Sequence, residues 1–223
     1  MSKKKKPKTI VIVCEGQTEI NYFNEIRCEI RNNRVKVVPP KDAKGIQTAK
    51  KFMDMAWDAY WEEVHDHRLK NVAKKHRVHP DDEVWCVFDK DKKTIGEMHK
   101  FFKLANDYGF NIACSSPAFE LWLYLHFADF SSTESFLRYK RQPSGENTLS
   151  PKLMKKMLQD KWPQYHKGRT TENSQYMQVL KNKENKAIQR AKAIKKEARE
   201  SGLDKFTYPF TDVDTLVERL RKL

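Results

Sequence analysis

Short segments with strand-like apolar residues recur through the first half of the chain. They cover residues 9–13, 35–38, 83–88 and 111–114, and the first of them is a continuous apolar, β-branched run. Continuous apolar runs of this length are typical of strands that are buried on both faces. Between them, apolar residues recur with helical spacing over 19–31, 48–75 and 94–108. Strands that alternate with helices predict an α/β fold with a mostly parallel sheet flanked by helices.

Beyond residue 117 the pattern changes, and the elements that it indicates are helices. Helices are expected over residues 118–127, 131–140, 150–161, 172–201 and 213–221. The loop at 142–147 is the expected seam between the two parts. The chain therefore divides into a basic, disordered tail (1–8), an α/β core (9–141) and a basic helical extension packed on that core (142–223).

The composition narrows the class of protein. The four cysteines of the 223 residues are scattered without a CxxC pair, which favours a reduced, cytoplasmic protein. No apolar run approaches the roughly 20 residues that a membrane-spanning helix needs, so no membrane association is expected. With seven glycines and no GxxxxGK or GxGxxG motif, a P-loop and a Rossmann dinucleotide site are both disfavoured.

The net charge of +14 is unevenly distributed. Residues 152–205 hold 15 basic and six acidic residues, and residues 1–8 hold five lysines, so the rest of the chain is neutral. This asymmetry predicts a polyanionic partner, nucleic acid above all. The alternative is a solvated helix surface with a basic tail. The candidate phosphate-binding residues are Lys152, Lys155, Lys156, Lys167, Arg169 and Arg190. Nearby aromatic residues either stack on bases or pack between helices; they are Trp162, Tyr165 and Tyr176.

Carboxylates follow the ends of the predicted strands. Glu15 ends the first strand and Glu19 follows one helical turn later, while Asp89 and Asp91 end the third strand. Glu120 comes just after the fourth strand. Carboxylates that converge from parallel strands repel one another unless a cation lies between them, and oxygen ligands suit Mg²⁺ or Mn²⁺. The alternative is that these acids only form turns and cap helices.

The turn after the first strand has its own expectations. Thr18 is expected to cap the following helix. Gly16 is expected to let a phosphate group approach the backbone, because glycine has no side chain.

Three segments together carry a family resemblance: IVIVCEGQTEINYF, VWCVFDKDKK and SSPAFELWLYLHF. They resemble the RloB family, a Toprim-related group found with restriction–modification and abortive-infection loci. One departure is Ser116, where that family commonly has Asn. The resemblance implies a Toprim-like core over 9–141, a divalent metal ion and nuclease chemistry in phage defence.

The resemblance also implies roles for single residues. Glu15 matches the general acid/base position, Asp89 and Asp91 match the metal-binding pair, and Glu120 can complete the metal site. Accessory candidates are Glu19 and His126, although His126 does not share a helix face with Glu120. Four further histidines indicate a solvated basic helix end more strongly than a zinc site; they are His65, His67, His76 and His79.

Two functions stay open at this point. The first is a metal-dependent nuclease that cleaves RNA, with tRNA as the first candidate, in preference to DNA. The RNA preference rests on analogy with Toprim effectors of other defence systems. The second is a non-catalytic nucleic-acid sensor or regulatory subunit. RloB-type genes often neighbour an ATPase gene, so an ATPase partner is expected with either function.

Overall fold

The computed structural model describes residues 9–39, 48–64, 78–130, 150–168, 176–202 and 204–223. Several expectations lie outside these residues: the tail 1–8, the helix 131–140, the seam 142–147, Arg169, and the histidines at 65, 67 and 76. The second half of the helix expected over 48–75 lies outside them too.

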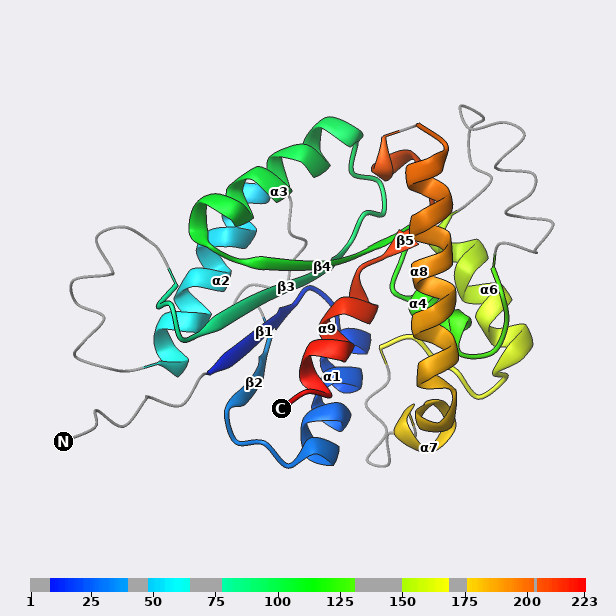
Figure 1. Ribbon diagram of the computed structural model, residues 1–223, viewed down its shortest axis with the longest axis horizontal. Helices are drawn as coiled ribbons and strands as arrows, with labels where there is room; N and C mark the ends of the chain where they lie inside the picture. The colour runs from blue at the N-terminus through cyan, green and yellow to red at the C-terminus, as the bar shows by residue number, and fades with distance from the viewer. Residues whose placement is uncertain (1–8, 40–47, 65–77, 131–149, 169–175, 203) are drawn as a thin grey trace.

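The expected α/β sheet is present (Figure 1). Its strands lie in the order β2-β1-β3-β4-β5, and the first four run parallel. They are β1 (Ile10–Cys14), β2 (Val35–Val38), β3 (Glu83–Asp89), β4 (Asn111–Ser116) and β5 (Phe210–Thr211). The apolar runs thus predict all four parallel strands.

The fifth strand departs from the sequence prediction. β5 comes from the C-terminal part, between the helices expected over 172–201 and 213–221, where no strand was predicted, and it pairs antiparallel with the end of β4. Two residues are too few to show a strand period, so the pattern of β5 cannot be recognised without its partner. Ser115 Oγ and Thr211 Oγ1 join the two strands by a hydrogen bond of 2.9 Å.

Helices cover both faces of the sheet. On one face α2 (Ala49–Glu63) and α3 (Ile95–Tyr108) pack against Val11 and Val13 of β1. The opposite face, with Ile10 and Ile12, packs against the remaining helices. These are α1 (Gln17–Ile30), α4 (Glu120–Leu125), α6 (Pro151–Lys161), α7 (Tyr176–Leu180), α8 (Glu184–Glu200) and α9 (Val213–Leu220). The alternation along β1 therefore builds two cores from one strand.

Local sequence signals explain several helix ends. Thr94 forms a capping box with Glu97, and α3 ends at Gly109, whose φ of 74° favours glycine. Ser150 caps α6 by accepting a hydrogen bond from the Leu153 N–H, with Pro151 in the first helical position.

The prediction of a single helix over 172–201 is wrong. The described part of this segment comprises α7, a 3₁₀ turn (η3, Lys181–Lys183) and α8. Leu180 is buried in the core, while Lys181 pairs with Glu29 of α1. The apolar stripe predicts both helices, but the tighter turn between them depends on these contacts with α1.

Aromatic residues of the C-terminal part lie in the core. Trp162, Tyr165 and Tyr176 are all buried, and the Trp162 ring packs against the other two at centroid distances of 5.7 Å and 5.6 Å. Of the two alternatives for these side chains, the structure supports packing between helices.

A further 3₁₀ turn, η4 (Lys205–Thr207), leads into β5. No described helix is both long and apolar enough to cross a membrane.

Candidate functional site

Acidic side chains meet at the carboxyl end of the parallel strands. A cavity of about 260 Å³ is lined there by Glu15 from the β1–α1 turn, by Glu19 from the first turn of α1, and by Asp89 and Asp91 at and just after the end of β3. Lys167 lies opposite them. We call this the acid cavity. Open parallel sheets bind their ligands at this edge, because successive loops converge there.

Hydrogen bonds donated by backbone N–H groups hold the two acidic turns together. The Asp89 N–H donates to Glu15 Oε2 at 3.3 Å, and the Glu15 N–H donates to the Val87 carbonyl. Asp91 adopts φ 44°, in the left-handed region, and its N–H donates to the Pro117 carbonyl at 3.1 Å. The β3–α3 turn is therefore tied both to the β1–α1 turn and to the end of β4.

Lys93 is a member of the site that the sequence analysis did not select. Its ammonium group donates to the Asp89 carbonyl at 2.8 Å and lies 3.5 Å from Glu15 Oε2. It also lies over the rings of Phe88 and Phe101. Its position in the sequence could have indicated this, because Lys93 follows Asp89 by four residues in the turn between β3 and α3.

Glu19 and Asp89 are destabilised in their charged forms. Burial raises the pKa of Glu19 to about 7, with a further rise from Glu120 and Glu15 that Lys167 opposes. Burial also raises the pKa of Asp89, reinforced by the neighbouring Glu19 and Glu120. Each carboxyl group thus holds its proton more tightly, mainly because it is buried away from water and secondly because other acids lie near it.

Glu120 is fully buried and is bound by two side chains from beyond α6. The Tyr165 hydroxyl donates to Glu120 Oε1 at 2.9 Å, and Lys167 Nζ lies 3.2 Å from the same oxygen. Burial lowers the pKa of Lys167, but Glu120 and Asp89 outweigh it and leave the pKa raised. Lys167, expected to contact phosphate groups, therefore balances the charge of the acids.

The turn at the start of α1 differs from the expected helix cap at Thr18. Thr18 does not cap the helix; α1 begins after Gly16, and Thr18 Oγ1 accepts a hydrogen bond from the Gly168 N–H at 3.1 Å. The space beside Gly16 is taken by Glu19, because a Cβ on Gly16 would lie 2.6 Å from Glu19 Oε2. Glycine at this position makes room for the Glu19 carboxyl group, and the approach of a phosphate to Gly16, which also lines the cavity, stays a prediction.

Other candidates lie away from the acid cavity. His126 is buried at the end of α4, with Nδ1 3.0 Å from the Trp122 carbonyl, and burial lowers its pKa to about 4. Arg190 donates to the Leu125 carbonyl at 2.5 Å. Both therefore hold the end of α4 in place. His79 is partly buried and bonds with the Asp81 N–H.

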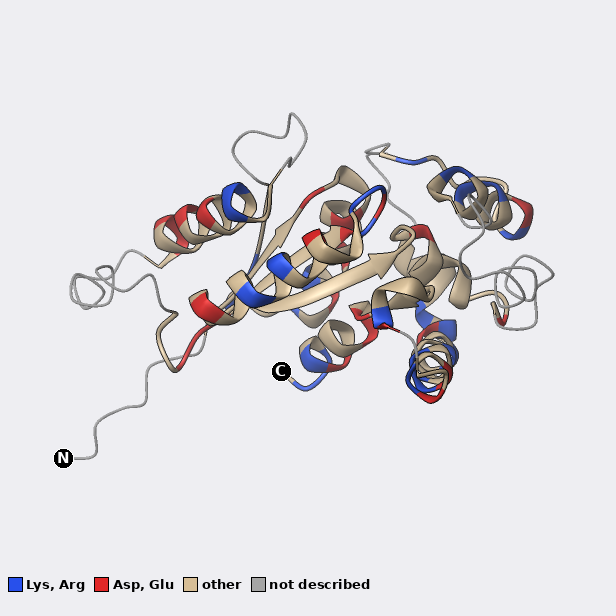
Figure 2. Cartoon of the chain, turned by 90° about the horizontal axis from the view of Figure 1, so that it is seen from above, with Lys and Arg blue, Asp and Glu red and all other residues tan. Residues whose placement is uncertain are grey.

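Three lysines remain on the helix next to the cavity. Lys152 and Lys156 are exposed on α6 and Lys155 is partly exposed, while Pro151 of the same helix lines the acid cavity. Basic residues are gathered on α6 and α8 in the C-terminal half (Figure 2). This arrangement puts cationic side chains beside the acidic groups.

The donor chemistry of the cavity suits a hard divalent cation. Asp89 Oδ1 is buried without a hydrogen-bond partner. An unpartnered carboxylate oxygen among mutually repelling acids is stabilised by such an ion. The residues that would hold it are Asp89, Asp91 and Glu15, with Glu19 beside them. As the side chains stand in the described part of the chain, no three Asp, Glu, His or Cys groups are close enough together to hold a metal ion.

The fold and this site define an α/β protein with an acid-lined cavity at the carboxyl edge of its parallel strands. The family model of RloB-like proteins matches residues 10–220, and the chain belongs to this family. Neither the curated proteins nor the solved structures compared with the chain include a match.

Proposed function

We propose that the chain is a metal-dependent nuclease that cleaves phosphodiester bonds of nucleic acid, RNA in preference to DNA, as an effector of phage defence. The observation that carries the proposal is the acid cavity, where Glu15, Glu19, Asp89 and Asp91 line one space next to a basic helix. The defence role is what the resemblance to the RloB family implies, and the RNA preference rests on analogy with Toprim effectors of other defence systems.

A divalent cation held there would neutralise charge and make its bound water more acidic. Asp89 and Asp91 would provide carboxylate oxygens for it. Glu15 is the candidate proton acceptor, because its carboxyl group is partly exposed to the cavity and is oriented by the Asp89 N–H and by Lys93. General acid–base catalysis by a side chain typically increases the rate of a reaction by a factor of roughly 10² to 10⁴.

Cations and amide dipoles favour a phosphate group in this place. Lys167 lines the cavity, Lys93 lies 3.5 Å from Glu15 Oε2 behind it, and the first turn of α1 opens onto the cavity. The positive field of a helix N-terminus adds to this attraction. The exposed lysines of α6 are placed to bind the adjoining backbone phosphates of a long substrate.

A cleavage assay tests the proposal. The full-length protein is incubated with total RNA or supercoiled plasmid DNA, with Mg²⁺, Mn²⁺ or EDTA. Cleavage in Mg²⁺ or Mn²⁺ and not in EDTA is the expected result. Asp89→Asn should abolish it, and Glu15→Gln should slow it by about 10² to 10⁴. Asp107→Asn, which removes an exposed carboxylate on α3, serves as the matched control and should cleave at the wild-type rate.

A second function has one observation in its favour. Glu120 pairs with Lys167 and Glu15 pairs with Lys93, so lysines of the chain itself balance part of the acidic charge. This arrangement fits a non-catalytic nucleic-acid sensor or a regulatory subunit beside an ATPase partner. If the wild type binds RNA but cleaves neither substrate with either metal, with the neighbouring ATPase added, the nuclease proposal is wrong and the sensor replaces it.

A further inference from the structure

Lys167 separates Glu120 from the acid cavity. Among the described residues, Lys167 lines the cavity and Glu120 does not. The Glu120 side chain is 1 % exposed, whereas that of Lys167 is 47 % exposed. The Lys167 ammonium group lies 3.2 Å from Glu120 Oε1 and donates to Oε2 at 3.4 Å. A cation that enters the cavity therefore meets the ammonium group before it meets the Glu120 carboxylate.

Both carboxylate oxygens of Glu120 already have hydrogen-bond donors. Oε1 accepts from the Tyr165 hydroxyl at 2.9 Å, and both oxygens are within reach of Lys167. Asp89 differs, because it lines the cavity and its Oδ1 has no hydrogen-bond partner. A metal ion at Glu120 would have to replace donors that are in place, and it would leave the Lys167 charge without this partner. Asp89 is therefore the better metal ligand of the two.

The backbone on either side of Lys167 is held to the rest of the molecule. The Tyr165 carbonyl accepts from Gln159 Nε2 of α6 at 3.2 Å, and the Tyr165 side chain is part of the core. The Gly168 N–H donates to Thr18 Oγ1 of α1 at 3.1 Å. The ammonium group thus belongs to a short segment with a contact on each side of it. A cation held in this way needs little reorganisation when a substrate binds.

The charges of the site match one divalent ion better than two. Five carboxyl groups and two ammonium groups line the cavity or contact those that do: Glu15, Glu19, Asp89, Asp91, Glu120, Lys93 and Lys167. Even with every carboxyl group ionised, these groups sum to three negative charges. One divalent ion leaves a single negative charge, whereas a second ion would make the site positive before any phosphate is bound. The two lysines already supply the charge that a second ion would bring.

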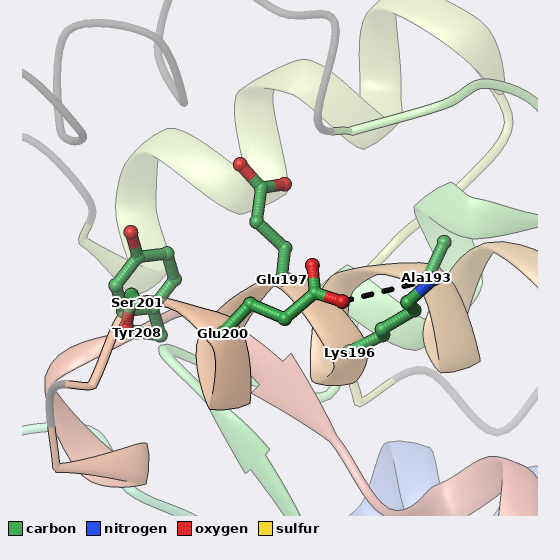
Figure 3. Close-up of a pocket in the computed structure, with 6 residues that line it drawn as sticks. All are labelled: Ala193, Lys196, Glu197, Glu200, Ser201 and Tyr208. Atoms are coloured by element: carbon green, nitrogen blue, oxygen red, sulfur yellow. Dashed lines mark ion pairs between the residues drawn. The ribbon is translucent and has the colours of Figure 1, made fainter.

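A lysine–glutamate pair on α8 provides a contrast. Lys196 Nζ lies 3.7 Å from Glu200 Oε1, as the dashed line in Figure 3 shows. Both partners are mostly exposed, and they line a different pocket together with Glu197. Exposed pairs of this kind are screened by water and contribute little. The pair of Glu120 and Lys167 differs because its carboxylate is buried, so that the removal of one partner leaves a costly charge behind.

We propose that Glu120 positions Lys167 and is not a metal ligand, and that the free protein binds one divalent cation in the acid cavity, with the Lys167 ammonium group in place of a second. Because it concerns the same site, this inference rests on the proposed function. In sites with two metal ions, the ions lie roughly 3.5–4 Å apart and both stabilise the reacting phosphate. Here a lysine of the chain itself provides one of the two positive charges, and Glu120 holds it in place.

Calorimetric titration of the full-length, metal-free protein with Mn²⁺ tests the inference without a cleavage reaction. The wild type should bind one ion per chain. The decisive variant combines Glu120→Gln with Lys167→Met, which removes both charges and keeps an acceptor for the Tyr165 hydroxyl. It should bind one Mn²⁺ with a Kd within about threefold of the wild type, because no metal ligand is lost. Loss of a ligand would weaken binding by at least the roughly tenfold that outer partners of a metal site contribute.

Two single replacements separate the charge of Lys167 from its shape. Lys167→Met leaves the Glu120 charge unbalanced, so this variant should bind Mn²⁺ about tenfold more tightly than the wild type. Lys167→Arg keeps the charge and should bind as the wild type does. The matched control is the exposed pair on α8. Lys196→Met, alone or together with Glu200→Gln, should leave both the number of bound ions and the Kd unchanged.

Three results would overturn the inference and leave the metal-dependent nuclease standing. They are two Mn²⁺ ions in the wild type, wild-type affinity in a folded Lys167→Met variant, and a double variant that binds Mn²⁺ about tenfold more weakly, which would make Glu120 a ligand. One ion and an unchanged double variant, without cleavage of RNA or DNA, would reject the proposed function alone. A wild type that binds no Mn²⁺ would refute both. If Lys167→Met fails to fold, the double variant still decides, because it leaves neither charge of the pair unbalanced.

Discussion

The Glu19 carboxyl group is buried beside other acids, and its pKa rises from 4.5 to about 7. In the unfolded chain the same group loses its proton near pH 4.5. Between these values the folded protein keeps a proton that the unfolded chain has released, so the free energy of unfolding must fall as the pH rises from 4.5 to about 7. The stabilising effect is complete below pH 4.5 and is lost above about pH 7.

The size of the effect follows from the two pKa values. A rise from 4.5 to about 7 corresponds to about 3 kcal/mol in the free energy of unfolding. Glu19→Gln mimics the protonated side chain at every pH. We therefore expect this variant to match the wild type near pH 4.5 and to be more stable by about 3 kcal/mol at pH 8.

Urea denaturation followed by tryptophan fluorescence measures this difference at pH 4.5, 6, 7 and 8, with EDTA present to remove divalent ions. Glu200→Gln is the control for loss of one surface glutamate, and its stability should stay parallel to that of the wild type. If the stability of Glu19→Gln also runs parallel to the wild type across this range, the Glu19 carboxyl group is not buried among the other acids, and the arrangement of the acid cavity is wrong.

Three further predictions concern the same region. Asp89→Asn should raise the melting temperature in EDTA, because it relieves repulsion among the acids. Added Mg²⁺ or Mn²⁺ should then raise the melting temperature less in this variant than in the wild type. An equal rise in both proteins would place the ion elsewhere. Tyr165→Phe leaves the buried Glu120 without its hydroxyl donor and should destabilise the fold by about 1–3 kcal/mol in urea titrations, whereas unchanged stability would argue against this hydrogen bond. Replacing the three α6 lysines with Ala should lower the slope of log affinity for RNA against log salt by roughly two to three, and an unchanged slope would put the nucleic-acid surface on another face.

The sequence by itself predicts most of the α/β framework. Apolar β-branched runs such as 10–13 and 84–88 can be satisfied only by burial on both faces, so they determine parallel strands without reference to the rest of the chain. The helix caps Thr94 and Ser150 bond to a backbone N–H three residues further on, so the local sequence is enough to predict them. The same local reasoning places Glu15 and Asp89 at strand ends, where the parallel sheet brings them to one edge.

Tertiary structure alone decided how those acids are surrounded. Tyr165 and Lys167 reach Glu120 from more than forty residues away, and neither partner shows in a local pattern. The same holds for β5, whose two residues become a strand only when β4 is beside them. The charge state of a buried acid depends on desolvation and on its neighbours in space. The sequence therefore determined which acids meet, while the packing of distant segments determined their pKa values and their partners.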